Sequence, residues 1–502
     1  MQLESPLGST DTPESPGQLA SSDSSWELDF GSDNTEDGSD ISLSRSAHVL
    51  RLPADVLTLI FAMVGIDSYH DFVRHERFCP SPMLMISRVC SAWRDAAFSS
   101  PLLWTSIFEY LPWKLDSINL HLGRSAPLPF DVHLVATEEV WRKTNPSTDG
   151  VDIPQDVFRN AYDQADALWH VLKNHMPRCR RLFIQIHDDF QPIMLNLLAH
   201  FGDSSIPLAL LEELHLEEYS DVFSHSPMES VAIFPKGAPA LKKATIGVAL
   251  SLPSYHQLTS LEVRTTFLTV SEFCSILSQC GLLEHLAICD DFKDGWPDVA
   301  LPTLEFPSLS SIFFYDSLAV SSVLLLISAP RLDHLFIGRF YPQDLDEFYK
   351  HLPSNPGKFP KLKALTLALD NEHPPDGVLA ALQCTSRCFP DLERATFVGE
   401  RYLVASAALH ARDMGGRLPW PKLHTLAFRS PIGLRELVAF RDRVGLPLRT
   451  IYLGELAVPG DQELAWLEER LEVVKLDVWD ELRQGGMYFP YRAFGTEEEE
   501  DP

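Results

Sequence analysis

The sequence lacks the short motifs that mark common enzyme sites. It has no Gly-x-x-x-x-Gly-Lys-Ser/Thr phosphate loop, no Gly-x-Gly-x-x-Gly segment after a strand, no Gly-x-Ser-x-Gly elbow and no His-Glu-x-x-His motif. The paired carboxylates Asp188-Asp189 and Asp290-Asp291 follow predicted strands, where we interpret them as the first residues of loops rather than as acid/base pairs. We therefore predict a protein that is not an enzyme and has no catalytic residues.

Patterned cysteines are also lacking. The eight cysteines are scattered along the chain, with no Cys-x-x-Cys pair and no Cys/His spacing of a zinc finger. We interpret them as free thiols in a reducing compartment. His70, His75 and Cys79 lie close together in the sequence, but their spacing fits no familiar ligand pattern, so a loop is preferred to a metal site there. We expect no metal ion and no other cofactor.

Positive charge and long apolar runs are both in short supply. Lys and Arg number 41 against 70 Asp and Glu, which gives a formal net charge of −29. This balance argues against nucleic acid or an anionic membrane surface as the main partner. The longest apolar run, 323–329, is far shorter than the ~20 residues that span a bilayer, and the N-terminus has no apolar signal core. We expect a soluble protein of the cytoplasm, the nucleus or both.

What the sequence does contain is a repeat. A unit of the form Leu-x-x-Leu-x-Leu recurs about twelve times at a mean period of roughly 27 residues, within the range of leucine-rich repeats. A proline often precedes the unit and ends the preceding helix. The copies begin at Cys179, Leu211, Leu241, Leu258, Leu283, Leu309, Leu332, Leu362, Leu392, Leu423, Leu448 and Val473.

Helical patterns separate several of these units, so each repeat is predicted to be a strand followed by a helix. Neither element buries its apolar face alone, and stacking of neighbours supplies the shared core. The predicted fold class is an α/β solenoid, a leucine-rich-repeat-like horseshoe; the alternative is a conventional α/β sheet with right-handed crossovers. The predicted helices cover 271–279, 319–328, 345–351, 377–388, 434–444 and 462–471.

The residues between the leucines of each unit are predicted to line the other face of the strand row, because side chains alternate along a strand. Near the middle of this row Phe313, Tyr315 and Phe336 form an aromatic group, flanked by His285 and His334. Exposed aromatic side chains of this kind suit a binding hot spot, so these five residues are the candidate substrate contacts. The alternative is that the face binds nothing, or is covered by loops and tails.

The N-terminal part holds two short amphipathic segments. Pro53 suits the first position of a helix, and apolar residues recur at helical spacing up to Val64. A second apolar stripe runs from Ile86 to Ala97 and is followed by Pro101-Leu102-Leu103-Trp104. Two such helices bury too little surface to be stable alone, so we expect them to pack against a partner.

These residues resemble an F-box, which typically opens with Leu-Pro and an apolar helix and closes with Val-Cys-x-x-Trp-Arg and Leu-Trp. The long insertion 65–83 and the later Arg124-Ser125-Ala126-Pro127-Leu128 segment are similar to F-box proteins of mushroom-forming fungi. The resemblance covers about a tenth of the chain and implies docking on a Skp-family adaptor and, through it, a cullin. The implied adaptor-binding residues are Leu52, Pro53, Val56, Leu57, Ile60, Val89, Trp93, Leu103 and Trp104.

Together these features predict five segments and a function. They are a disordered acidic tail (1–46), an F-box helical domain (47–108), a linker helix, first strand and loop (109–177), the repeat solenoid (178–484), and a C-terminal cap with an acidic tail (485–502). The predicted function is that of the substrate-recognition subunit of a Skp–cullin–F-box ubiquitin ligase, which binds a protein substrate on the repeats. The alternative is an F-box scaffold that does not direct ubiquitylation. A hydrolase or transferase with a site in the repeats is disfavoured.

Overall fold

The computed structural model describes most of the chain between residues 52 and 475. The predicted tails 1–46 and 485–502 and most of the insertion 65–83 lie outside the described residues. Contacts divide the chain between Leu52 and Pro53, and every element below belongs to the second unit. The described ranges are 52–53, 55–64, 82–136, 155–187, 190–203, 205–219, 231–247, 250–252, 255–265, 268–292, 294–297, 301–315, 319–338, 346–351, 358–368, 375–398, 418–428, 433–453 and 460–475.

The N-terminal part of this unit is helical. Residues 55–64 form one helix, and the second predicted helix is two helices, α2 (Pro82–Val89) and α3 (Ser91–Ser99). Cys90 separates them because its backbone is extended, with φ −159° and ψ 172°, and its Sγ accepts the backbone N–H of Trp93 at 3.5 Å as an N-cap. The 3₁₀ turn η2 (Pro101–Trp104) follows, with its proline at the start.

The sheet begins earlier than the sequence predicts. Its first strand, β1 (Ser106–Tyr110), follows η2 almost at once, and helix α4 (Leu115–Ser125) leads to β2 (Phe130–Ala136). The helix and strand predicted here are confirmed, whereas β1 and the long helix α6 (Gln155–Leu172) were not predicted. The buried Trp104 ties the helical part to the sheet, because its Nε1 donates to the carbonyl of Ala97 and its ring packs on His121 of α4.

Fourteen strands form one parallel sheet whose strand order follows the chain without reversal. This order is that of an α/β solenoid, since a conventional doubly wound sheet reverses its strand order. The strands after β2 are β3 (Cys179–His187), β4 (Glu213–Tyr219), β6 (Lys243–Gly247), β8 (Ser260–Arg264), β9 (His285–Cys289), β11 (Ser311–Tyr315), β13 (His334–Ile337), β14 (Ala364–Ala368), β15 (Arg394–Val398), β16 (Thr425–Phe428), β17 (Thr450–Leu453) and β18 (Glu472–Lys475).

Four two-residue strands leave this order and pair outside the main sheet. They are β5 (Val231–Ala232) with β7 (Leu250–Ser251), and β10 (Leu304–Glu305) with β12 (Ile327–Ser328). Both pairs are parallel and lie in the connections between strands of the main sheet, so neighbouring repeats are also joined there.

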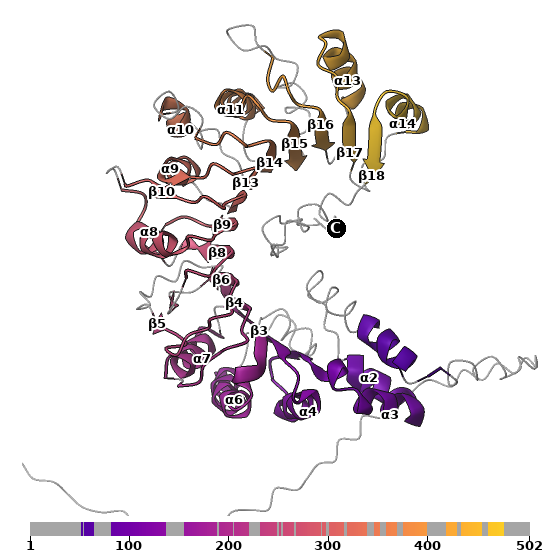
Figure 1. Ribbon diagram of the computed structural model, residues 1–502, viewed down its shortest axis with the longest axis vertical. Coiled ribbons are helices and arrows are strands. Elements are labelled where there is room, and N and C mark those ends of the chain that lie inside the picture. The colour runs from indigo at the N-terminus through magenta and orange to yellow at the C-terminus, as the bar shows by residue number, and fades with distance from the viewer. Residues whose placement is uncertain are drawn as a thin grey trace, which may run out of the picture. The chain divides into compact units, whose positions relative to one another are not determined.

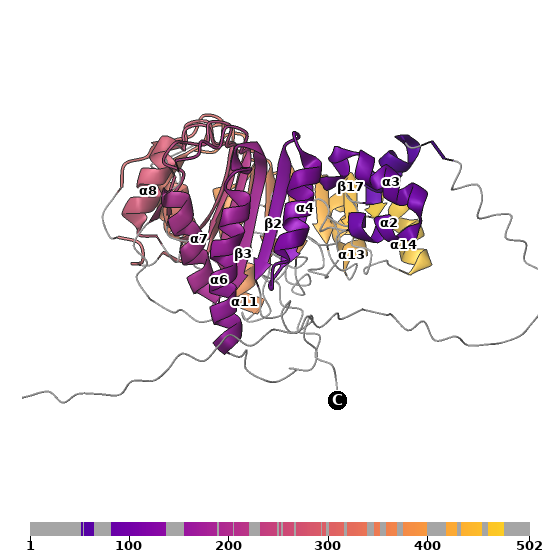
Figure 2. The same cartoon turned by 90° about the horizontal axis from the view of Figure 1, so that it is seen from below.

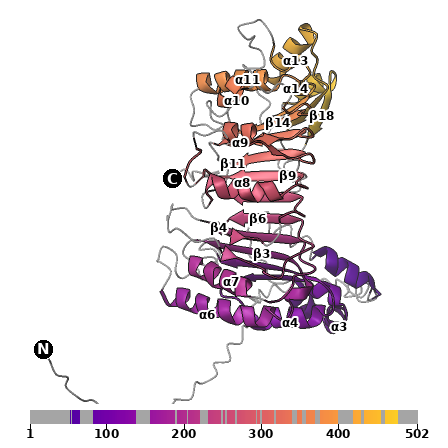
Figure 3. The ribbon, with the colours of Figure 1, turned by 60° about the vertical axis from the view of Figure 1, so that its left-hand side comes forward.

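Helices cover one face of the sheet, as Figures 1 and 3 show and Figure 2 shows from below. The six helices predicted between repeat units are confirmed within a few residues, while α7 was not predicted. The helices after α6 are α7 (Gln191–Asp203), α8 (Val270–Gln279), α9 (Val320–Leu326), α10 (Asp346–His351), α11 (Pro375–Cys388), α13 (Leu434–Arg443) and α14 (Asp461–Glu468).

The main core lies between the sheet and these helices. The regularly spaced leucines and isoleucines of the repeat units enter one continuous cluster, in which Leu214, Leu216 and Leu335 are at most 1% exposed. The prediction that they point inward is therefore confirmed. Burial of each such side chain stabilises the fold by roughly 1.5–3 kcal/mol, which makes this cluster the main source of cohesion between repeats.

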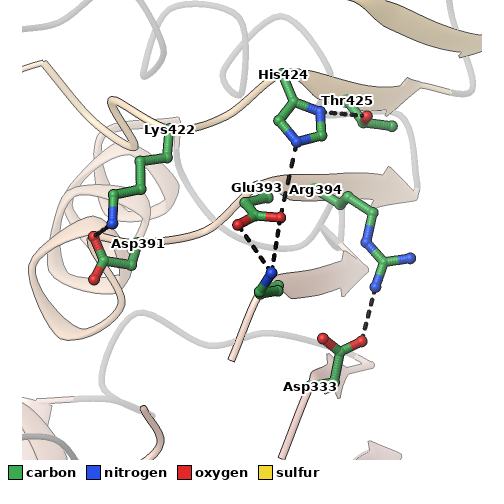
Figure 4. A network of polar contacts seen from close by, with 8 residues as sticks. Asp333, Asp391, Glu393, Arg394, Lys422, His424 and Thr425 are labelled. Atoms are coloured by element: carbon green, nitrogen blue, oxygen red, sulfur yellow. Dashed lines mark hydrogen bonds and ion pairs between the residues drawn. The ribbon is translucent and has the colours of Figure 1, made fainter. Parts of the chain in front are cut away.

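A ladder of ion pairs also links successive repeats at the start of their strands (Figure 4). Glu393 accepts from Lys363 at 3.1 Å, and Arg394 reaches Asp333 at 2.8 Å across the intervening strand β14. Lys422 pairs with Asp391 at 2.8 Å. Because these groups are largely exposed, each pair contributes only about 0–1 kcal/mol, so we interpret them as a solvated ladder and not as a reactive site.

Candidate interaction surfaces

Helix 55–64 carries apolar side chains on two opposite sides. Leu57 and Phe61, one turn apart, face inward and are 4% and 1% exposed, with the Phe61 ring centroid 5.1 Å from that of Trp93. Leu59 and Met63, also one turn apart, are 66% and 65% exposed. A helix that is apolar all round is normally buried on all sides, so the outward half of this helix is expected to pack against another surface.

Exposed apolar side chains are concentrated in this helical part. Among the described residues, eight of the thirteen large hydrophobic side chains that are exposed belong to helix 55–64, α2 or η2. Such concentration is a mark of a protein interaction surface. We refer to these eight as the apolar helical surface: Val56, Leu59, Ile60, Met63, Val64, Met85, Val89 and Leu102.

The residues implied by the F-box resemblance fall into two groups. Pro53, Val56, Ile60 and Val89 are exposed, and Leu52 and Trp93 are partly exposed. The others, Leu57, Leu103 and Trp104, are buried and hold the helices together, so their side chains are not presented to a partner.

Val64 was placed on the first apolar stripe but not among the adaptor-binding residues, and four further members of the apolar helical surface were missed from the sequence: Leu59, Met63, Met85 and Leu102. Their only signal was that they are apolar yet out of register with the buried stripe of their helix. That signal is weak in a sequence because scattered exposed apolar residues are common.

A second surface is the helix-free face of the sheet, where the residues between the repeat leucines stand in register across the strands. Its central row is Phe108, His133, Phe183, His215, Thr245, Glu262, Ala287, Phe313, Phe336 and Thr366. The sequence predicted that such a row would form, and the register confirms it.

The aromatic group predicted on this face is assembled but not exposed. Phe313, Tyr315 and Phe336 form an apolar cluster of their own, separate from the main core, with ring centroids 5.2–6.4 Å apart. Their side chains are 1%, 6% and 0% exposed, so the expectation of exposed aromatic rings is wrong. Strands ~4.8 Å apart bring large rings on neighbouring strands into contact, so the rings help to bury one another.

The two flanking histidines lie on the same face at the starts of β9 and β13, and both are half-buried. His285 Nδ1 lies 2.6 Å from Ser311 Oγ, and His334 Nε2 lies 3.0 Å from Thr366 Oγ1. Burial lowers the pKa of both, and that of His334 falls to about 4. Both side chains are therefore neutral hydrogen-bonding groups at neutral pH, and of the five candidate substrate contacts they are the two that retain appreciable exposure.

Four rings form a stack at the N-terminal end of the row. The centroids of Phe108 and His133 are 4.7 Å apart, those of His133 and Phe183 4.3 Å, and those of Phe183 and His215 5.5 Å, with interplanar angles of 21°, 13° and 28°. Because His133 and Phe183 each lie between two other rings, their faces are not available as a platform for another flat group. Burial lowers the pKa of His133 to about 3, so this ring is neutral.

The stack ends at a buried charged group, the glutamate cluster, made of His215, Glu217, Glu262, Arg264 and Cys289. Glu217 Oε1 accepts from Arg264 Nη2 at 2.5 Å, and Glu217 Oε2 lies 2.9 Å from His215 Nε2. Glu262 accepts from Cys289 Sγ at 3.7 Å. Alternation along the strands puts these five residues on one face, but the sequence alone does not group them, because their contacts join strands that are far apart in the chain.

A glycine makes the glutamate cluster possible. Arg264 of β8 reaches Glu217 of β4 across the intervening strand β6, where Gly247 stands in register with Glu217. A Cβ atom on Gly247 would lie 3.1 Å from the Glu217 Cα and 3.3 Å from the Arg264 Cδ. The missing side chain therefore leaves the path open for the ion pair.

Comparison with known proteins does not identify the chain. No family model matches it, and no curated protein matches. A structural genomics protein from Bacteroides fragilis is similar at 14% identity, with a TM-score of 0.27 and coverage of 68% of this chain and 82% of that one. A likeness this weak supports no conclusion about function.

Among the described residues, no group of three or more His, Cys, Asp or Glu side chains is arranged to hold a metal ion. Within the same residues, no helix is both long and apolar enough to cross a membrane.

Proposed function

We propose that this protein is a substrate-recognition subunit of a Skp–cullin–F-box ubiquitin ligase. Its apolar helical surface docks a Skp-family adaptor, and its repeat domain binds a protein substrate. The observation that carries the proposal is the outward half of helix 55–64, where Leu59 and Met63 are about two-thirds exposed while Leu57 and Phe61 hold the helix to the rest of the chain. The F-box resemblance supplies the identity of the partner.

We expect helix 55–64 to dock as a helix in an apolar groove of the adaptor. Side chains spaced three and four residues apart on one helix enter an apolar groove of the partner, here Val56, Leu59, Ile60 and Met63. The transfer of apolar surface from water drives the association at roughly 25 cal/mol per Å² of buried area. Val89 of α2 extends the apolar helical surface beyond this helix.

The repeat domain contributes recognition. Its helix-free face offers the half-buried His285 and His334 together with the charged edge of the strand starts. A substrate held there is brought close to a ubiquitin-charged enzyme, and the resulting high effective concentration is what accelerates transfer. The protein itself supplies proximity and no catalytic group.

The ligase role is tested by the abundance of proteins that co-purify with the full chain. We expect cells that express Val89→Asp to accumulate these proteins, because adaptor docking is lost while the repeat face still binds them. Leu282→Asp serves as the matched control, since Leu282 is similarly exposed on a loop of the repeat domain.

The outcomes separate the ligase from the scaffold. Accumulation with Val89→Asp but not with Leu282→Asp supports the ligase. Unchanged abundance in both, with the adaptor still bound by the unaltered chain, would instead favour an F-box scaffold.

A further inference from the structure

We propose that the glutamate cluster is a proton-binding site: Glu262 holds a proton next to the ionised Glu217, and release of this proton weakens the repeat array around β4 to β9. This inference does not depend on the proposed ligase function. It rests on two buried carboxyl groups that stand on the same face of the sheet but have very different partners.

Glu217 is the carboxyl group that stays ionised. It is 2% exposed, and its two oxygens contact Arg264 at 2.5 Å and His215 at 2.9 Å. Hydrogen bonds to charged donors are the strong ones, and they favour the ionised form of the carboxyl group. Glu217 thus has direct contacts with two cationic side chains.

Glu262 is the carboxyl group that holds the proton. It is 6% exposed, and its hydrogen bonds are longer and come from neutral groups, Thr245 Oγ1 at 3.5 Å and Cys289 Sγ at 3.7 Å. Burial raises the pKa of Glu262 to about 7, and the negative charge of Glu217 adds to that effect. The charges of His215 and Arg264 act in the opposite direction without cancelling it.

The other titratable groups that face Glu262 include Cys289, Tyr315 and His215. Burial and the charge of Glu262 raise the pKa of Cys289 and of Tyr315 well above their usual values, so both stay neutral when Glu262 titrates. Burial lowers the pKa of His215, but its hydrogen bond with Glu217 and the charges of Glu217, Glu262 and Glu213 outweigh burial and raise it. Loss of a proton from Glu262 therefore favours protonated His215, and the two titrations are coupled.

The stability of the folded chain is expected to fall as the pH rises through the pKa of Glu262. The pKa of Glu262 is higher in the folded chain, about 7, than its ordinary value of 4.5. The protonated carboxyl is favoured by folding, so its contribution is complete below about pH 4.5 and is lost as the pH rises through about 7. Strands β4, β6, β8 and β9 contribute the groups around Glu262, so they are expected to loosen first.

The test is infrared titration of the full chain, which detects the C=O stretch of protonated carboxyl groups. We expect a band that disappears with a midpoint near pH 7 in the unaltered chain and is absent from Glu262→Gln. The comparison with the variant is needed because burial also raises the pKa of Glu109. Glu393→Gln is the matched control, since Glu393 carries its own ion pairs at the exposed strand starts.

Glu217→Gln provides a second test if Glu262→Gln folds poorly. Glu217→Gln removes the neighbouring negative charge, so the midpoint of the Glu262 band should move to lower pH. The proposal is overturned if the band near pH 7 persists in Glu262→Gln, if the unaltered chain shows no such band, or if Glu217→Gln leaves the midpoint in place.

Discussion

At the scale of single residues, the chain uses its helix-free face for groups that the sequence alone would place in solvent. Glu217 and Glu262 are almost fully buried, and His133 is stacked between two phenylalanine rings. These positions were predictable as members of one row, because alternation along a strand fixes the face. Their burial was not predictable, since it depends on partners that lie one or two repeats away.

Gly247 is the residue whose replacement tests this arrangement most simply. We expect Gly247→Val to lower the free energy of unfolding by about 2–4 kcal/mol, because the new side chain collides with Glu217 and separates it from Arg264. Urea unfolding followed by circular dichroism measures the change. In the control Gly281→Ala the new Cβ meets no atom within 4 Å, so its stability should be nearly unchanged; an equal loss in both variants would contradict the account.

His334 provides a prediction about acid. Burial lowers its pKa from 6.5 to about 4, so folding favours the neutral ring, and stability is lost as the pH falls from about 6.5 to about 4. This fall in the pKa of His334 limits the loss of unfolding free energy to on the order of 3 kcal/mol. His334→Gln should retain more of its neutral-pH stability at about pH 4 than the unaltered chain does, as measured by urea unfolding at both pH values. An identical acid loss in the two proteins would show that His334 does not contribute.

At the scale of elements, helical spacing predicted most of the helices between repeats and the opening helix of the N-terminal part. It did not predict the break between α2 and α3, because an apolar stripe continues across Cys90 even though the backbone does not. Helix α6 was missed although Ala165, Leu168 and Leu172 of its buried side recur at helical spacing. Strand β1 was missed because its five residues directly follow the F-box-like segment and contain no repeat unit.

In the N-terminal helices, we expect buried side chains to determine stability and exposed side chains to determine docking. Trp104→Ala should cost about 3–5 kcal/mol of unfolding free energy, because it leaves a large cavity and removes the hydrogen bond to the Ala97 carbonyl. Leu59→Ser should change stability by less than about 0.5 kcal/mol, because its side chain is largely exposed. Thermal unfolding of the full chain measures both, and a large loss in Leu59→Ser would mean that this side chain is buried in the free protein.

At the scale of the whole molecule, repetition was the most informative feature of the sequence. The recurring Leu-x-x-Leu-x-Leu unit predicted a solenoid with strands in chain order, and the fourteen-stranded parallel sheet has that order. The F-box identity of the N-terminal helices stays a prediction from resemblance. What the structure adds is an apolar helical surface on one part of the chain and a long row of in-register side chains on another, an arrangement suited to joining two partners.

The most direct test of this account is the affinity of the full chain for a purified Skp-family adaptor, measured by calorimetry. Ile60→Asp is compared with Leu195→Asp, because Ile60 and Leu195 are 40% and 39% exposed and both lie on helices, but only Ile60 belongs to the apolar helical surface. We predict that Ile60→Asp weakens binding by at least about tenfold, or ~1.4 kcal/mol, while Leu195→Asp binds as the unaltered chain does. No binding by the unaltered chain, or equal affinities of the two variants, would contradict adaptor docking through this surface.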